Sequence, residues 1–271
     1  MASMFLSQIF VYPIKSLRGI AVSETQLDTS GPLRDRRWML VDHEGVFLSQ
    51  RTLPRMALLR PRFEGAGLIV TAPKMPPLLI SEWSGEGDWL PVRIWRDYLT
   101  LPHPNQSYSD WFSAFLGLPC RLVHLPDTVQ RPVEPPYNQP ESRVSLADGY
   151  PLLILTQASL DLLNEKLSAP VTVERFRPNL VISKTSAHDE DNWRRLQIGN
   201  VKLSIVKPCA RCSIVLIDPD TAQPDIEPLR TLSRYRRMPR SVMFAQNALI
   251  LNPGHLRVGE SVDILERVVA A

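Results

Sequence analysis

The chain has 271 residues, of which 44% are apolar and 22% charged, the composition of a folded globular protein with one large or two modest cores. Its formal net charge of +3 is too small to indicate nucleic-acid binding by itself. It has three cysteines, which argues against a disulfide-stapled secreted domain. No N-terminal leader and no apolar run near the roughly 20 residues of a membrane span are present, so we expect a cytoplasmic protein without membrane contact.

Short β-strands are expected along most of the chain, because β-branched and aromatic residues recur between turn residues. Residues 42–45 predict a hairpin turn between strands at 38–41 and 46–50. Asn252, Pro253 and Gly254 predict a closing hairpin between 248–251 and 256–265. The other expected strands are 8–14, 68–71, 92–95, 121–124, 201–205 and 213–217.

Helical patterns are fewer. Apolar residues share one face of 111–116, and Gly117 is suited to end that helix. Leucines at 160, 163 and 167 follow Thr156, a good N-cap, and Pro228 is suited to open a third helix through 229–232. The long gaps between helices do not fit regular βαβ alternation. We therefore expect an α+β fold, predominantly β, with antiparallel or barrel-like sheet.

One segment resembles a boundary. Residues 126–140 contain five prolines, which do not fit a helix or a central strand. We expect a domain junction or a long surface loop here.

The most informative segment contains Cys209 and Cys212 around Ala210 and Arg211, with Lys207 before them. A structural zinc site would need two more ligands, and a thioredoxin-like dithiol would normally start a helix, whereas 213–217 is expected to be a strand. Two small cysteines buried in a core are the simplest alternative. The nearby cations instead favour a thiolate, the form of cysteine that binds soft metals.

Three further basic groups occur where strands begin or end. They are Lys15 with Ser16, the arginines at 34, 36 and 37, and the segment Arg175, Arg177 and Asn179. Each group alone is typical of a solvated strand end. Together with Lys207 and Arg211 they would suit one anion if the fold brought them together, since arginine forks match phosphate oxygens.

Taken together, the ordered motifs resemble a known family. They are Tyr-Pro-Ile-Lys-Ser at 12–16, Leu-Arg-Asp-Arg at 33–36, Phe-Arg-Pro-Asn at 176–179, Cys-Ala-Arg-Cys at 209–212 and Asp-Pro-Asp-Thr at 218–221. The chain is similar to MOSC-domain proteins with an N-terminal MOSC companion domain, the family that includes the mitochondrial amidoxime reducing components and bacterial reductases of N-hydroxylated compounds. The resemblance implies a MOSC-type β-barrel at 126–271 packed against a smaller N-terminal α+β domain at 1–125.

The resemblance also implies a molybdenum–molybdopterin cofactor whose metal is bound by the second cysteine, Cys212, which would be the catalytic residue. Cys209 would be a neighbour and not a ligand. Asp148 falls at the floor of the family's site, and Tyr150 replaces a small residue there. The residues implied to bind the cofactor are Lys15, Ser16, Arg36, Tyr150, Arg177, Asn179, Ala210, Arg211, Cys212, Gln246 and Asn247.

The implied activity is the reduction of small N-hydroxylated or related N-oxygenated compounds. Only two cysteines remain beside Cys212, too few for a ferredoxin-type cluster, so electrons would come from a separate ferredoxin, flavodoxin-like protein or cytochrome. Two alternatives remain open: a sulfur carrier that holds a persulfide, and a cofactor-binding module without turnover.

Overall fold

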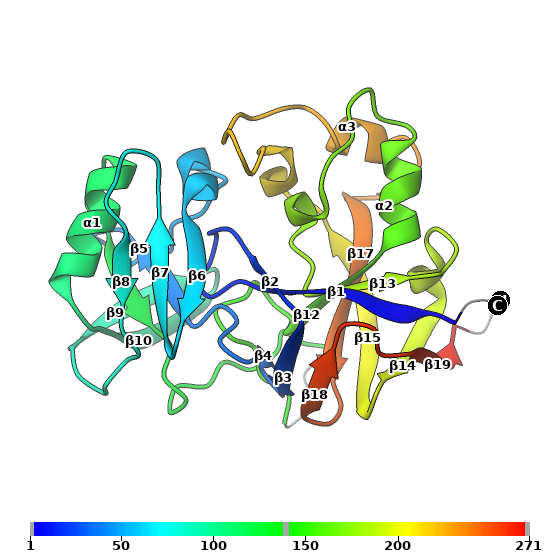
Figure 1. Ribbon diagram of the computed structural model, residues 1–271, viewed down its shortest axis with the longest axis horizontal. Coiled ribbons are helices and arrows are strands. Elements are labelled where there is room, and N and C mark those ends of the chain that lie inside the picture. Colours follow the sequence, from blue (N-terminus) through cyan, green and yellow to red (C-terminus); the bar gives the residue numbers. More distant parts are fainter. Residues whose placement is uncertain (1–2, 138–140, 269–271) are drawn as a thin grey trace.

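The computed structural model describes residues 3–137 and 141–268, and most of its regular structure is β-strand. A larger lobe contains a nine-stranded sheet, and a smaller lobe contains short sheets and helix α1 (Gln106–Leu116) (Figure 1). The predicted fold class, α+β with predominant β-structure, is confirmed.

The nine-stranded sheet takes strands from both ends of the chain. All its pairs are antiparallel except β12 with β13. The spatial order is β19 (Val262–Arg267), β14 (Trp193–Ile198), β15 (Val201–Ala210), β17 (Ser241–Ile250), β12 (Leu152–Thr156), β13 (Leu180–Ser183), β1 (Phe5–Val11) and β2 (Ile20–Val22), with β16 (Arg237–Met238) paired to β17.

The two ends of this sheet approach each other. Phe5 of β1 forms an isolated bridge with Ser261, which directly precedes β19. The backbone nitrogen of Leu6 donates to Glu260 O at 2.9 Å, and Leu6 O accepts from Gly259 N at 2.8 Å. The sheet therefore curves like a barrel but is not closed: in the described part of the chain one bridge, and no ladder, joins β1 to the residue before β19, and β2 remains the last strand in the order.

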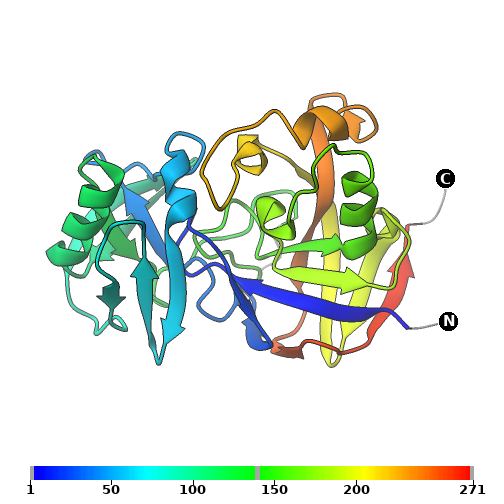
Figure 2. The same cartoon turned by 45° about the horizontal axis from the view of Figure 1, so that its top comes forward.

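Strand β1 begins at the far side of the larger lobe, runs across that lobe toward the smaller one and is an integral strand of the large sheet (Figure 2). Leu6 and Ile9 are buried in the core on one side of the sheet. Phe10 and Tyr12 are buried in the core on the other side, where helices α2 (Gln157–Asn164) and α3 (Leu229–Leu232) pack. The N-terminal segment thus contributes to both cores of the larger lobe.

The smaller lobe is built from hairpins and short sheets around two apolar cores. A further sheet joins the chain's beginning to its end, because β18 (Gly254–Arg257) pairs with β3 (Glu24–Asp28), which pairs with β4 (Gly31–Pro32). The small-lobe elements are β5 (Trp38–Val41) with β11 (Arg121–His124), β9 (Asp88–Ile94) with β10 (Asp97–His103), β6 (Arg60–Glu64), β7 (Gly67–Thr71), β8 (Leu78–Ile80) and the 3-10 helix η1 (Pro54–Leu58).

The three predicted helices are present. Gly117 ends α1 in the left-handed conformation, with φ of +75°. The Thr156 side chain caps α2, and Pro228 directly precedes α3, while Leu167 lies beyond the end of α2. Two 3-10 helices, η2 (Val173–Phe176) and η3 (Asp189–Asn192), lie in the larger lobe. Among the described residues, no helix has the length and apolar character to cross a membrane.

Several strand predictions were wrong. Residues 213–217 do not form a strand, because β15 leaves the sheet at Ala210 and the chain turns into the 3-10 helix η4 (Ser213–Leu216), which buries Val215. The expected strand at 256–265 is two strands, and its first half pairs with β3 and not with the preceding strand. Residues 46–50 make only isolated bridges, at Val46 and Phe47.

The proline-rich segment is more than a surface loop. Its described part, residues 126–137, has only an isolated bridge, from Pro132 to Arg143, yet Val133 is buried there, and Val144 and Leu146 are buried in the residues that follow. The chain after this segment places residues 147–150 where the two lobes meet. The division at 125/126 stays a prediction, and β1 shows that the larger lobe also includes N-terminal residues.

Candidate functional site

A cavity opens to solvent where the two lobes meet, and it brings together most of the predicted site residues. Including its mouth, it encloses about 790 Å³. Each of the three basic groups and the cysteine segment contributes residues to its lining, although these segments are far apart in sequence. The predicted residues that line it are Lys15, Ser16, Arg36, Tyr150, Arg177, Asn179, Ala210, Arg211, Cys212 and Asn247.

Three residues of this cavity have left-handed backbone conformations. The angle φ is +66° at Ser16, +46° at Arg36 and +56° at Arg177. Residues other than glycine adopt this region rarely, at a cost of about 1–3 kcal/mol each. Strain maintained at three points around one cavity is typical of a functional site.

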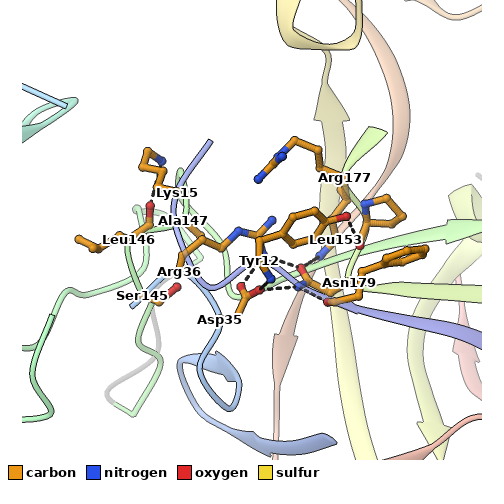
Figure 3. Close-up of polar contacts among 12 residues, drawn as sticks. Tyr12, Lys15, Asp35, Arg36, Ser145, Leu146, Ala147, Leu153, Arg177 and Asn179 are labelled. Carbon is orange, nitrogen blue, oxygen red and sulfur yellow. Dashed lines mark hydrogen bonds and ion pairs between the residues drawn. The ribbon is translucent and has the colours of Figure 1, made fainter. Parts of the chain in front are cut away.

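The ring of Tyr12 is buried, and the guanidinium groups of two arginines pack against it (Figure 3). The guanidinium carbons of Arg36 and Arg177 lie 4.4 and 4.3 Å from the centre of its ring. Its hydroxyl donates to Pro178 O at 2.9 Å, and burial raises the pKa of Tyr12, so the ring stays neutral. Burial lowers the pKa of Arg177 to about 10, which leaves this side chain charged at neutral pH.

Asp35 and Asn179 hold Arg36 in place. Arg36 Nη1 donates to an Asp35 carboxylate oxygen and to Asn179 Oδ1, the latter at 3.1 Å. Asp35 Oδ1 also accepts from the backbone nitrogen of Tyr12 at 2.7 Å. Burial raises the pKa of Asp35, and the Arg36 charge opposes that shift. The network fixes one guanidinium nitrogen of Arg36 on the protein side of the cavity.

Lys15 is buried beside the same cavity. Its Nζ donates to Leu146 O at 2.8 Å and to Asp148 Oδ1 at 2.5 Å. Desolvation lowers the pKa of Lys15 to about 8, although Asp148 opposes the shift. Desolvation favours the neutral acid at Asp148, but the charge and hydrogen bond of Lys15 hold its pKa well below the usual range. Both groups are therefore mainly ionised at neutral pH.

The two cysteines of the pair are partly exposed, and both line the cavity. Arg51 Nη1 lies 3.8 Å from Cys212 Sγ, and Arg211 Nη1 lies 3.1 Å from Cys209 Sγ. Each sulfur thus has a guanidinium as a polar neighbour, an arrangement suited to an anionic ligand atom. The interpretation of both cysteines as core residues is excluded by their exposure.

Arg211 has a buried nitrogen that lacks a protein partner. Its Nη2 donates to Phe176 O at 2.8 Å. In the part of the chain that the structure describes, Arg211 Nε is buried without a hydrogen-bond partner. An unpaired buried donor costs about 1–3 kcal/mol.

Gln246 is the predicted site residue that does not line the cavity. Its side chain is buried, and its Nε2 donates to Asp191 Oδ1 at 2.6 Å. The next residue, Asn247, lines the cavity. Successive strand residues face opposite sides of a sheet, so only one of this pair can face the site.

Some of the predicted basic residues do not converge on the cavity. Arg37 pairs with Asp127, and Arg175 Nη2 lies 2.9 Å from Asp218 Oδ2. Lys207 Nζ lies 4.7 Å from the centre of the Tyr150 ring and so approaches the site only indirectly. Among described residues, no three His, Cys, Asp or Glu side chains gather to hold a metal, so the structural-zinc interpretation of the cysteines finds no further ligands.

Sequence reasoning missed two residues that shape this site. Asp35 stands between two arginines of a motif already noted, so a counter-ion role could have been inferred from the sequence; in the structure it pairs with Arg36. Arg51 lies outside every basic group, and nothing in its local sequence points to Cys212, from which it is 161 positions away in the chain.

Family comparison agrees with this arrangement. The MOSC N-terminal beta barrel domain matches residues 3–119, and the MOSC domain matches residues 141–263. The chain belongs to the MOSC family.

Its relatives include enzymes named for amidoxime reduction. Human mitochondrial amidoxime-reducing component 1 is 33% identical over 96% of this chain and 82% of its own length. Human mitochondrial amidoxime reducing component 2 is 32% identical over 95% of this chain and 82% of its own length. The molybdenum cofactor sulfurase of Oryza sativa subsp. japonica is 30% identical over 97% of this chain, but the match spans only 34% of that protein.

Among solved structures, the YuaD protein from Bacillus subtilis aligns with 96% of this chain and 94% of its own, with 9% identity and a TM-score of 0.42.

Proposed function

We propose that this protein binds a molybdenum–molybdopterin cofactor through Cys212 and reduces N-hydroxylated or related N-oxygenated compounds. The observation that supports this most directly is the partly exposed Cys212 sulfur in a cavity that Lys15, Arg36, Arg177 and Arg211 also line. The names of the human relatives suggest the substrate class.

The residues present suit an anionic, phosphate-bearing cofactor. A phosphate leaving water needs several cationic or amide donors to offset its lost hydration. The cavity offers these through Lys15, Arg36, Arg177 and Arg211. The left-handed backbone at Arg36 and Arg177 helps to fix the positions of two of these donors.

When bound, the cofactor would supply two-electron chemistry at a metal held by the Cys212 sulfur. The protein's own part is to bind the anion, orient it and keep the surrounding charges fixed. Converting an N–OH group to N–H breaks the N–O bond, consumes two electrons and two protons and releases one water. A separate electron-transfer protein of ferredoxin, flavodoxin-like or cytochrome type would supply the electrons. A cytoplasmic location stays a prediction.

Metal content tests the proposal. Protein produced with ample molybdenum should hold close to one molybdenum per chain, because Cys212 faces a cationic cavity. Cys212→Ser should lose the metal, and Cys209→Ser, the matched neighbouring control, should largely keep it. Elemental analysis of the purified proteins measures this. Equal metal content in all three proteins would contradict ligation by Cys212.

A sulfur carrier is the second candidate, favoured by the match to the rice sulfurase. It predicts a mass increase of one sulfur atom, removable by a thiol reductant, on Cys209 or Cys212. A cofactor-binding module without turnover predicts full metal content but no reduction of an amidoxime by a chemical reductant. Mass spectrometry and that assay separate both alternatives from the reductase.

A further inference from the structure

Side chains of the smaller lobe lie beside the Cys212 sulfur. Arg51 precedes η1, and Trp95 lies in the turn between β9 and β10. Arg51 Nη1 is 3.8 Å from Cys212 Sγ, and the Arg51 guanidinium carbon is 4.4 Å from the centre of a Trp95 ring. A flat guanidinium–indole stack is therefore placed next to the sulfur.

Trp95 is anchored although much of it is exposed. Its φ is +56°, a conformation that bulky residues rarely adopt. Its Nε1 donates to Asp148 Oδ1 at 3.0 Å, and its ring lies 5.0 Å from that of Phe47. Even so, 47% of the residue is exposed. The positive φ belongs to the two-residue turn between β9 and β10. The exposed ring is held against Arg51 and Asp148, which both line the cavity, so it is placed where a ligand at the mouth of the cavity can contact it.

The ring contacts of Arg51 leave most of its N–H donors free. Among the described residues, the Arg51 guanidinium contacts the Cys212 sulfur and the rings of Trp95 and Phe47. A guanidinium has five N–H donors in a planar fork. Arg51 can therefore donate to an oxygen atom beside the sulfur while its plane remains stacked on the indole.

We propose that Arg51 and Trp95 form a substrate subsite that selects planar, conjugated N-hydroxylated compounds, such as an amidoxime joined to an aromatic ring. This inference rests on the proposed function. The conjugated part stacks on the guanidinium–indole pair, and Arg51 donates to the N–O oxygen. A small aliphatic amidoxime receives only the second contact.

The test compares two substrates on molybdenum-loaded protein, benzamidoxime and acetamidoxime, with reduced methyl viologen as electron donor. Trp95→Ala should lower kcat/KM for benzamidoxime roughly five- to tenfold, mainly through KM, because stacking is lost. Acetamidoxime should change less than about twofold. Trp89→Ala is the matched control, because Trp89 has 48% exposure and lies on β9 of the same hairpin. It should change neither substrate.

Binding without reductant provides a second readout. Calorimetric titration of benzamidoxime into oxidised protein should show about fivefold to tenfold weaker binding for Trp95→Ala. Trp95→Phe should keep most of the wild-type affinity for benzamidoxime. Trp95→Leu, which keeps apolar bulk without a π face, should bind it about as weakly as Trp95→Ala. Trp95→Leu also replaces Trp95→Ala if the latter fails to fold.

Arg51→Lys should reduce turnover of both substrates, since the planar fork is lost. Arg55→Lys is the control, because Arg55 lies 4.8 Å from the Phe115 ring and does not line the cavity. An equal effect of Trp95→Ala on the two amidoximes, or the same effect from Trp89→Ala, overturns the subsite alone. Metal-loaded wild type that reduces neither amidoxime overturns the proposed function, and the subsite with it.

Discussion

At the scale of single residues, burial sets the charge state of Lys15. Its side chain is 7% exposed, and its ammonium has one carboxylate partner, Asp148, whose attraction does not fully offset desolvation. The pKa of Lys15 therefore falls from 10.5 to about 8. A lysine of this kind carries its positive charge at neutral pH but loses it in mildly alkaline solution, where an exposed lysine is still charged.

This shift predicts a pH limit for anion binding. Retention of the phosphate-bearing cofactor should be full below a pH of about 8 and weaken above it, because Lys15 then becomes neutral. Lys15→Arg should retain the cofactor to higher pH, since arginine stays charged. Molybdenum and phosphorus per chain after dialysis across this pH range provide the measurement. Identical profiles for the two proteins would show that Lys15 does not contribute.

The same lowered pKa affects stability in the opposite direction. Between about 8 and 10.5 the unfolded chain binds more protons at Lys15 than the folded chain does. The contribution of this residue to the free energy of unfolding therefore rises with pH in that window. The free energy of unfolding measured on cofactor-free protein separates this effect on stability from the effect on cofactor retention.

At the scale of elements, the start of α2 combines a cap with a buried carboxyl group. Thr156 Oγ1 accepts from Ser159 N at 3.3 Å and donates to Glu190 Oε2 at 2.8 Å. The hydroxyl of Ser159 donates to Glu190 Oε1 at 2.7 Å. Glu190 is 1% exposed, and burial raises its pKa. The cap thus ties the helix to η3 as well as satisfying a backbone donor.

This arrangement predicts unequal costs for two cap deletions. Asn105→Ala at the start of α1 should lower the free energy of unfolding by about 1 kcal/mol, since its side chain only accepts from Ser107. Thr156→Ala should cost about 2–3 kcal/mol, because Glu190 also loses a donor. Urea unfolding of both variants measures the difference. Equal costs would mean that Glu190 finds a replacement donor.

At the scale of the whole molecule, the two lobes depend on each other through the N-terminal segment. Strand β1 pairs with β13, and β1 with the residue after it buries Leu6, Ile9, Phe10 and Tyr12 in the cores of the larger lobe. Burial of such side chains contributes roughly 1.5–3 kcal/mol each. Their sum is comparable to the total stability of a typical domain, about 5–15 kcal/mol.

A fragment with residues 126–271 should therefore not fold by itself. It would lose these four side chains and expose the edge of β13. Fusing residues 1–32 to it through a flexible linker should restore β1, β2 and the β3–β18 pairing and recover part of the structure. Circular dichroism and size-exclusion chromatography compare the two fragments. A monomeric 126–271 fragment that unfolds cooperatively would contradict this account.

The sequence by itself determined the features that depend on neighbouring residues. The predominance of strands, the end of α1 at Gly117 and the cap at Thr156 follow from propensity and capping chemistry, which act over a few positions. The site residues it proposed came from motifs, and all except Gln246 line one cavity. Their roles toward a cofactor stay proposals.

Features that require contacts between segments distant in sequence were decided only by the tertiary structure. The pairing of β18 with β3, the exit of the chain into η4 and the position of Arg51 beside Cys212 each result from how the cores pack. No local pattern encodes them, because burial of apolar surface is non-directional and is settled by the whole chain. The same packing turns separate basic groups into one cationic cavity.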